Sequence, residues 1–222
     1  MLLAVDTSTQ TIGLALYDGA QVAGEMTWQT KTHHTVELAP AVDDLLKRCN
    51  VKPTDLQAIA CGLGPGSFTS LRIGLALAKG MALSLKIPLL GIPTLDYLAA
   101  QQPLLNMPMA AILPAGRSRL AVGWYENKEG RWESLGAATI ITAEDLSAQI
   151  NQPTYICGEF DAEERQTLSR KWKNAVVATP AHCLRHPAML AELAWKRFQA
   201  GEQDEPISLA PIYLHVAEAI PD

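Results

Sequence analysis

A glycine-rich segment between residues 62 and 69, with the sequence GLGPGSFT, has the residue types best suited to ligand chemistry. Its three glycines let the backbone take positive φ and approach a ligand closely. A helix is expected directly after it, so free N–H groups of the first helical turn would point into the same space and could hold an anion. The segment lacks the lysine of a Walker loop and the spacing of a dinucleotide fingerprint. From these residues alone, a tight strand-to-helix turn is favoured over a phosphate site, and both interpretations stay open.

A zinc site is the second chemistry that the spacing allows. His182 and His186 lie four residues apart and flank Cys183, as three ligands on one helical turn would. Pro180 and Pro187 bound this segment tightly, and no glutamate lies between the histidines as in a zinc protease. A structural or surface role is therefore favoured for these three residues.

The cysteines and the overall charge exclude several classes of protein. The four cysteines lie far apart without paired spacing, which favours buried thiols over disulfides or a four-cysteine zinc site. A formal net charge of -5 argues against a chain that wraps nucleic acid by its own field. The first residues, Met1 to Asp6, have no basic leader and are interrupted by an acid, so we expect neither a signal peptide nor a membrane span, and a cytoplasmic protein.

We expect the chain to fold into two halves that share the same order of strands and helices and that position the residues described above. In the first half, apolar runs predict strands over 2–5, 11–17, 22–28, 56–63 and 89–92, and helices over 38–49, 67–86 and 95–100. In the second half, strands are predicted over 109–113, 120–125, 132–141 and 154–157, and helices over 143–150 and 162–172. The order strand, strand, strand, helix, strand, helix recurs, and Pro103 and Pro108 bracket a boundary. We expect an N-terminal subdomain of residues 1–104 and a C-terminal one of residues 105–222.

The helix predicted after the glycine-rich segment has an unusual row of small side chains. Ser70, Gly74, Ala78 and Ala82 are spaced by four, and large apolar residues cover much of the remaining surface. Gly74 and Gly80 each cost about 1 kcal/mol relative to alanine inside a helix, which indicates close approach of another backbone. Packing in the chain's own core and contact with another subunit explain this pattern equally well.

The segment from Ala60 to Gly74 resembles the signature of the TsaB (YeaZ) family. Weaker marks of the same family follow along the chain: Asp6-Thr7-Ser8, His34-Thr35, Pro88 with Gly91, Arg117, and Pro211-Ile212-Tyr213-Leu214. The chain departs from the family pattern at Ser70, where glycine is common, at Ala115, where we expect aspartate, and at His215, where arginine often stands. These departures concern residues expected to line the cleft that separates the two halves of such proteins.

The resemblance implies an α/β protein of actin-like ATPase fold with two similar subdomains. It implies a bacterial cytoplasmic, non-catalytic subunit in the formation of N6-threonylcarbamoyladenosine at position 37 of tRNAs that read codons beginning with A. Such proteins bind the paralogous transferase TsaD, work with the ATPase TsaE, can pair with themselves, and reach tRNA only through the complex, with no membrane involved. The helices assigned to the partner contact hold Leu38, Val42, Leu45, Ser70, Gly74, Leu77, Ala78 and Met81.

Comparison with the paralog implies that this chain has lost catalytic groups. The two histidines that hold the metal in TsaD correspond, through alignment at Pro88, to Thr94 and Leu98, so no catalytic metal is expected. A vestigial nucleotide or anion loop is expected at Asp6, Thr7, Gly64, Gly66 and Ser67, with Ser8 at a position where actin-like ATPases have glycine. The second phosphate turn, Pro114 to Arg117, has no acid. We therefore expect no cofactor, and a nucleotide at the partner interface is left open.

Two other functions remain as alternatives. Asp6 and the glycine-rich segment would suit a stand-alone ATP-dependent phosphotransferase of the same fold. The trio around Cys183 would suit a metallohydrolase, which echoes an older glycoprotease label for relatives.

Overall fold

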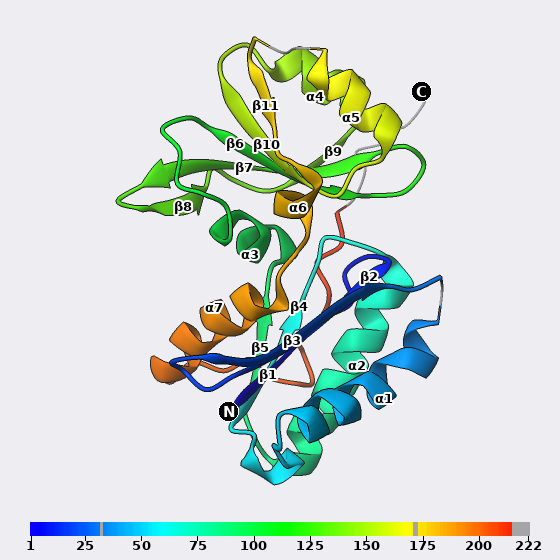
Figure 1. Ribbon diagram of the computed structural model, residues 1–222, viewed down its shortest axis with the longest axis vertical. Coiled ribbons are helices and arrows are strands. Elements are labelled where there is room, and N and C mark those ends of the chain that lie inside the picture. Colours follow the sequence, from blue (N-terminus) through cyan, green and yellow to red (C-terminus); the bar gives the residue numbers. More distant parts are fainter. Residues whose placement is uncertain (32, 171–172, 215–222) are drawn as a thin grey trace. The chain divides into compact units, whose positions relative to one another are not determined.

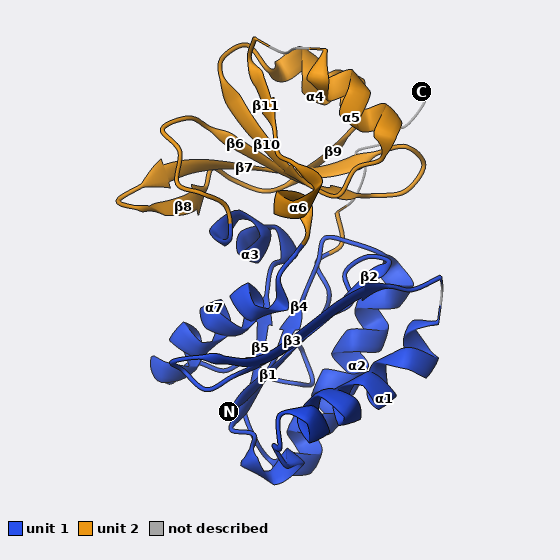
Figure 2. Cartoon of the chain, viewed as in Figure 1, with its two compact units in different colours: residues 1–101, 185–212 blue, residues 102–184, 213–222 orange. Residues whose placement is uncertain are grey.

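The computed structural model describes residues 1–31, 33–170 and 173–214, which form two compact units (Figure 2). Unit 1 comprises residues 1–101 and 185–212, and unit 2 comprises residues 102–184 together with the described residues from 213. His215, one of the departures from the family pattern, lies outside the described residues.

Unit 1 is built on a mixed sheet with the strand order β3-β2-β1-β4-β5. Its strands are β1 (Leu2–Asp6), β2 (Thr11–Tyr17), β3 (Val22–Gln29), β4 (Ala58–Gly62) and β5 (Leu89–Ile92). Its helices are α1 (His34–Arg48), the short η1 (Pro53–Asp55), α2 (Phe68–Leu85), α3 (Thr94–Ala100) and α7 (Pro187–Gln199). The first three strands pair antiparallel, and β1, β4 and β5 pair parallel.

Both faces of the unit 1 sheet are buried, which explains the nearly continuous apolar sequence of β1. Leu2 and Ala4 pack against α7 on one face, whereas Leu3 and Val5 pack against α1 on the other. Figure 1 shows α7 on one side of the sheet and α1 and α2 on the opposite side. The alternation of side chains along a strand thus places two cores, one on each face.

Unit 2 repeats this design with the strand order β11-β10-β6-β7-β8, and β9 also pairs with β7. Its strands are β6 (Met109–Pro114), β7 (Leu120–Lys128), β8 (Arg131–Ser134), β9 (Thr139–Ile141), β10 (Thr154–Gly158) and β11 (Ala175–Val177). Its helices are α4 (Ala143–Gln149), α5 (Ala162–Ser169) and α6 (Pro180–Cys183). The segment 132–141, expected as one strand, is split into β8 and β9 because Gly136 takes a φ of +151° between them.

The repeated sheet order bears out the expected duplication. In both units three antiparallel strands are followed by two parallel ones on the other side of the first strand. The compact units differ from the expected ranges 1–104 and 105–222 by a boundary three residues earlier and, mainly, by the place of one later segment. Residues 185–212 pack with unit 1, because α7 buries Leu190, Ala191 and Ala194 against the β1, β2, β4 and β5 strands.

Candidate functional site

The glycine-rich loop between β4 and α2 packs directly on the turn between β1 and β2. The Ser67 N–H donates to the carbonyl oxygen of Ser8 at 2.7 Å, and a Cβ added to Gly66 would collide with that same carbonyl. The Gly64 N–H donates to the Thr94 hydroxyl at 2.9 Å, and Gly64 has a φ of +95°. Two N–H groups of the glycine-rich segment therefore already have partners within the chain.

Asp6, at the end of β1, is buried and fully engaged in the same region. One carboxylate oxygen accepts from the Ser8 N–H at 2.9 Å, and the other accepts from Nε of Arg185 at 2.8 Å. Burial alone would raise the pKa of Asp6, but the Arg185 guanidinium and the Ser8 hydrogen bond outweigh it and hold that pKa below its ordinary value. Asp6 is thus an ionised carboxylate with an internal cation.

Thr7 and Ser67, the remaining expected loop residues, have structural partners. The Thr7 hydroxyl donates to the carbonyl oxygen of Ser70 at 2.7 Å, which ties the β1–β2 turn to the first turn of α2. Ser67 is the N-cap of α2, and its hydroxyl accepts from the Ser70 N–H at 3.4 Å. The expected loop residues do come together, and they serve to join β1, β4 and α2.

The small-residue row of α2 faces the chain's own sheet. Ser70, Gly74 and Ala78 are buried, and Ala78 packs with Ile59 and Cys61 of β4. A Cβ added to Gly74 would overlap the Thr7 hydroxyl, so this glycine is required by close approach within the chain. These three residues, which we expected at a partner contact, are therefore covered in the isolated chain.

The expected contact residues of α1 are covered in the same way. Leu38, Val42 and Leu45 are 2%, 4% and 2% exposed, and they pack with the β1 and β2 side chains on that face of the sheet. A partner that binds α1 would have to use other residues of that helix.

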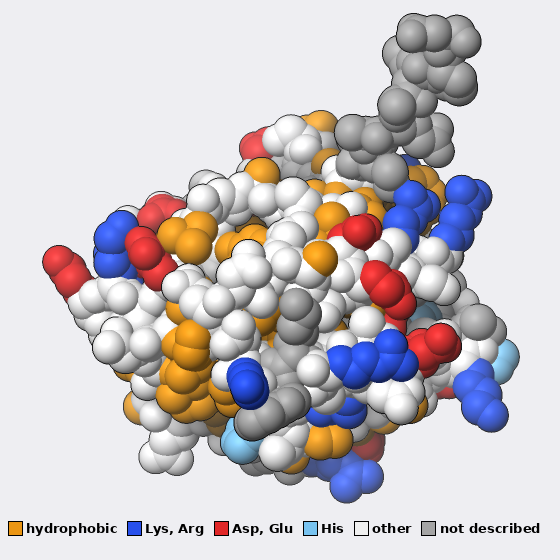
Figure 3. Space-filling view, turned by 90° about the horizontal axis from the view of Figure 1, so that it is seen from above, with side chains coloured by type: hydrophobic (Ala, Val, Ile, Leu, Met, Phe, Trp, Pro, Cys, Tyr) orange, Lys and Arg blue, Asp and Glu red, His pale blue; other side chains and the backbone are white. Residues whose placement is uncertain are grey.

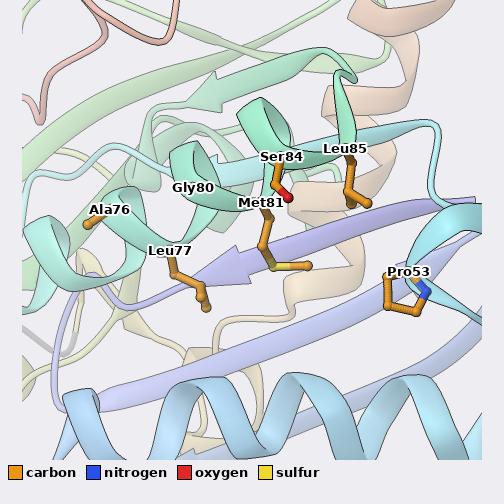
Figure 4. Close-up of a pocket in the computed structure, with 7 residues that line it drawn as sticks. All are labelled: Pro53, Ala76, Leu77, Gly80, Met81, Ser84 and Leu85. Atoms are coloured by element: carbon orange, nitrogen blue, oxygen red, sulfur yellow. The ribbon is translucent and has the colours of Figure 1, made fainter.

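The outer face of α2 carries a second row of small residues at the same spacing. Ala76, Gly80 and Ser84 are exposed and are again four residues apart. They lie along a shallow groove of about 380 Å³, together with Leu77, Met81, Leu85 and Pro53. Figure 4 shows Leu77, Met81 and Leu85 projecting from the same side of α2. Of the expected contact residues, Leu77 and Met81 are half-buried and line this groove.

Gly80 lacks the internal reason that Gly74 has. A Cβ added there would meet none of the described atoms within 4 Å. Glycine in a helix interior costs about 1 kcal/mol relative to alanine, and nothing in the described fold requires it at this position.

Among the described helices, one, α2, is long and apolar enough to cross a membrane by length and composition. A single such helix is weak evidence for a membrane protein. The inner face of α2 packs on the sheet of unit 1, with Leu75 and Ala82 in the same cluster as Ala78.

Comparison with known proteins identifies the family. The family model described as TsaD, tRNA N6-adenosine threonylcarbamoyltransferase, matches residues 22–215. The tRNA threonylcarbamoyladenosine biosynthesis protein TsaB of Bacillus subtilis is 32% identical over 222 residues, which cover 98% of this chain and 95% of that protein. The chain belongs to the TsaB family.

Solved structures agree with this assignment. YeaZ from Pseudomonas aeruginosa superimposes with a TM-score of 0.80 at 27% identity and covers 96% of this TsaB-family chain and 99% of its own. Component A of (R)-2-hydroxyglutaryl-CoA dehydratase from Acidaminococcus fermentans, with a TM-score of 0.51 at 12% identity, shares the fold alone, over 90% of this chain and 99% of its own. The expected actin-like fold is confirmed.

Thr94 and Leu98, the residues expected at the paralog's metal positions, have structural roles in this TsaB-family chain. Thr94 is buried, and its hydroxyl shares a hydrogen bond of 2.7 Å with that of Ser8, while Leu98 lies in the interior. The described residues contain no group of three His, Cys, Asp or Glu side chains placed to hold a metal ion. In the expected zinc trio, His182 contacts Thr179, Cys183 accepts from Arg165, and His186 pairs with Glu25.

Two features of this region were not expected from the sequence. Arg185 has no local pattern that reveals its pairing with Asp6, 179 residues earlier. The outer row of α2 is visible in the sequence, since Gly80 and Ser84 repeat the four-residue spacing. The partner contact was assigned to the longer inner row instead.

Proposed function

We propose that the chain is a non-catalytic subunit in the formation of N6-threonylcarbamoyladenosine in tRNA, and that it binds a TsaD-like transferase through the outer face of α2. Membership of the TsaB family supports the pathway. The buried threonine and leucine at the paralog's metal positions support a non-catalytic role, because neither side chain replaces imidazole as a ligand of a transition metal.

Gly80 is the observation that carries the proposed contact. No contact among the described residues requires a glycine at this position, and Gly80 lies in an exposed row with Ala76 and Ser84. Small residues spaced by four let a second helix approach closely, and Leu77 and Met81 beside them supply apolar surface to bury. A helix of the transferase, or α2 of a second copy of this chain, fits such a surface. We propose the first as the working complex and the second as the form adopted without the transferase.

A TsaE-like ATPase is proposed as a further member of the complex, and tRNA is proposed to be bound by the assembly, in the cytoplasm. On the face drawn in Figure 3, Lys and Arg side chains are interspersed with Asp and Glu. Such a mixed surface attracts a phosphate backbone weakly compared with a basic one. This supports contact with tRNA through the complex.

Reconstitution of the modification tests this proposal. Purified TsaD-like and TsaE-like proteins, tRNA and the substrates are combined with and without this chain, and modified adenosine is measured by mass spectrometry of digested nucleosides. We expect modified tRNA only when the chain is present. Equal modification without the chain would remove the proposed role.

A further inference from the structure

Arg185 is a large, fully buried charged side chain at the point where the chain re-enters unit 1. Its side chain is 0% exposed, and that of its partner Asp6 is 2% exposed. Removing two charges from water is costly, and a buried pair persists only where geometry and further hydrogen bonds compensate. The surroundings of Arg185 supply both.

The guanidinium reaches one continuous piece of chain, the turn between β1 and β2. Nε donates to Asp6 at 2.8 Å, and Nη2 donates to the Thr9 hydroxyl and to the Thr11 carbonyl oxygen, both at 3.2 Å. A planar guanidinium with several donors in fixed directions can make these contacts together, whereas a lysine ammonium cannot reproduce that fork. Arg185 therefore holds the turn from its start to its end.

The same turn is held from the opposite direction by the glycine loop. Ser8 accepts from Ser67 through its carbonyl and shares a hydrogen bond with Thr94 through its hydroxyl. Gly66 approaches Ser8 so closely that a Cβ would collide. The turn and the loop thus form one packed unit whose anionic group is Asp6.

An actin-like fold implies a nucleotide with its metal ion at this turn, and the residues present do not fit that ligand. The Asp6 carboxylate, which would face the cation, has both oxygens engaged by Arg185 and Ser8. The loop N–H groups of Gly64 and Ser67 donate to Thr94 and Ser8. Room for phosphate between loop and turn would require these contacts to break together.

We propose that Arg185 is a built-in counterion for Asp6: it holds the β1–β2 turn against the glycine loop without a ligand, and so keeps a magnesium nucleotide out of unit 1. This inference concerns the isolated chain and does not rest on the proposed function. A failed reconstitution would leave it intact.

Ligand binding by the wild-type chain is the first test. Thermal unfolding and calorimetric titration are carried out on the isolated protein with MgCl2 and ATP up to millimolar concentrations. We expect no saturable heat and no rise in Tm. A saturable rise in Tm that Asp6→Asn abolishes would overturn the proposal.

A double-mutant cycle isolates the counterion role. Arg185→Gln alone is expected to lower Tm by about 10 °C, the size expected when one partner of a buried ion pair is removed from a chain of this length. Asp6→Asn alone should also lower Tm, and the double variant should lose clearly less than the sum, because it leaves no uncompensated charge. Additive losses would overturn the proposal.

Chemical rescue tests the positive charge of Arg185 separately from the packing of its side chain. In Arg185→Ala, ethylguanidinium at tens of millimolar should raise Tm, whereas the neutral, similarly shaped ethylurea should not. Wild type and Arg48→Ala, whose arginine lies in an exposed pair with Asp44, serve as controls and should respond equally to both compounds. Equal responses in Arg185→Ala would overturn the counterion assignment.

Discussion

Glutamate substitutions at two alanines of α2, two residues apart, separate the helix's inner face from its outer face. Ala78 is 0% exposed among Ile59, Cys61 and Leu75, whereas Ala76 is exposed beside the groove. The same substitution therefore introduces a carboxylate into the core at one position and into water at the other. Ala78→Glu should damage folding, and Ala76→Glu should damage only partner binding.

The cost at Ala78 can be worked out from its burial. Keeping a buried glutamate neutral at pH 7 requires its pKa to rise from about 4.3 to about 7, which costs about 3.7 kcal/mol. The added atoms strain the packing by about 1–3 kcal/mol more. The sum, about 5 kcal/mol, corresponds to a fall in Tm of about 10–20 °C for a chain of this length. At Ala76, the change in stability should stay within about 0.5 kcal/mol.

Binding should show the reverse pattern. A glutamate at Ala76 would be desolvated without a partner in a close helix contact, so affinity for the TsaD-like protein should fall about 100-fold, which is about 2.7 kcal/mol. The assay pairs thermal unfolding with titration of the transferase, and Ala162→Glu, at an exposed alanine of α5 in unit 2, is the matched control. Wild-type affinity and modification activity in Ala76→Glu would refute the outer-face assignment. An unchanged Tm in Ala78→Glu would refute the burial argument.

Three further predictions concern the loop, the thiols and Asp6. Gly66→Ala should destabilise the chain strongly because its Cβ collides with the Ser8 carbonyl, whereas Gly80→Ala should raise the free energy of unfolding by about 0.5–1 kcal/mol; denaturant unfolding that ranks them otherwise contradicts the geometry. Of the four cysteines, only the partly exposed Cys49 should react with a thiol reagent at pH 8 in the native state. Burial raises the pKa of Cys61 to about 12, and the thiols of Cys157 and Cys183 are also buried. Rapid reaction of a second thiol before unfolding would contradict this prediction. The Arg185 guanidinium and the Ser8 hydrogen bond hold the pKa of Asp6 below its ordinary value of 3.8 despite burial, so its contribution to stability is complete above about pH 5 and is lost as pH falls through the folded-state pKa. The stability difference between wild type and Asp6→Asn should shrink over that range, and a constant difference would contradict this prediction.

The sheets and the main helices could be predicted from the sequence because their signals are local. The β1 strand is an apolar run, and the glycine-rich loop with its N-cap Ser67 marks the start of α2. The α7 helix was not among the expected helices, although it has apolar residues at helical spacing, including Leu190 and Ala194. No local pattern, however, indicates that a helix near the end of the chain packs on a strand at its beginning.

The candidate contact shows a different limit of sequence reasoning. Small residues at a spacing of four indicate that something approaches the helix closely, but they do not say whether it is the chain's own sheet or another molecule. Ser70, Gly74 and Ala78 proved to face the sheet, where the Thr7 hydroxyl occupies the space above Gly74. Only the coordinates of neighbouring atoms separate Gly74, which the fold requires, from Gly80, which it does not.

The internal closure of the loop has a consequence for binding at α2. A loop that needs a ligand for its order would leave the start of the following helix mobile until the ligand arrives, and a partner would then have to order it at a cost in conformational entropy. In this chain, Thr7 and Ser67 fix the first turn of α2, and Arg185 holds the turn that carries Thr7. The row Ala76, Gly80 and Ser84 is therefore presented on a helix that is already ordered. Arg185→Gln should accordingly weaken transferase binding although Arg185 is buried and lies outside the proposed contact surface, and normal affinity in a folded Arg185→Gln protein would show that order at the loop does not support the outer face.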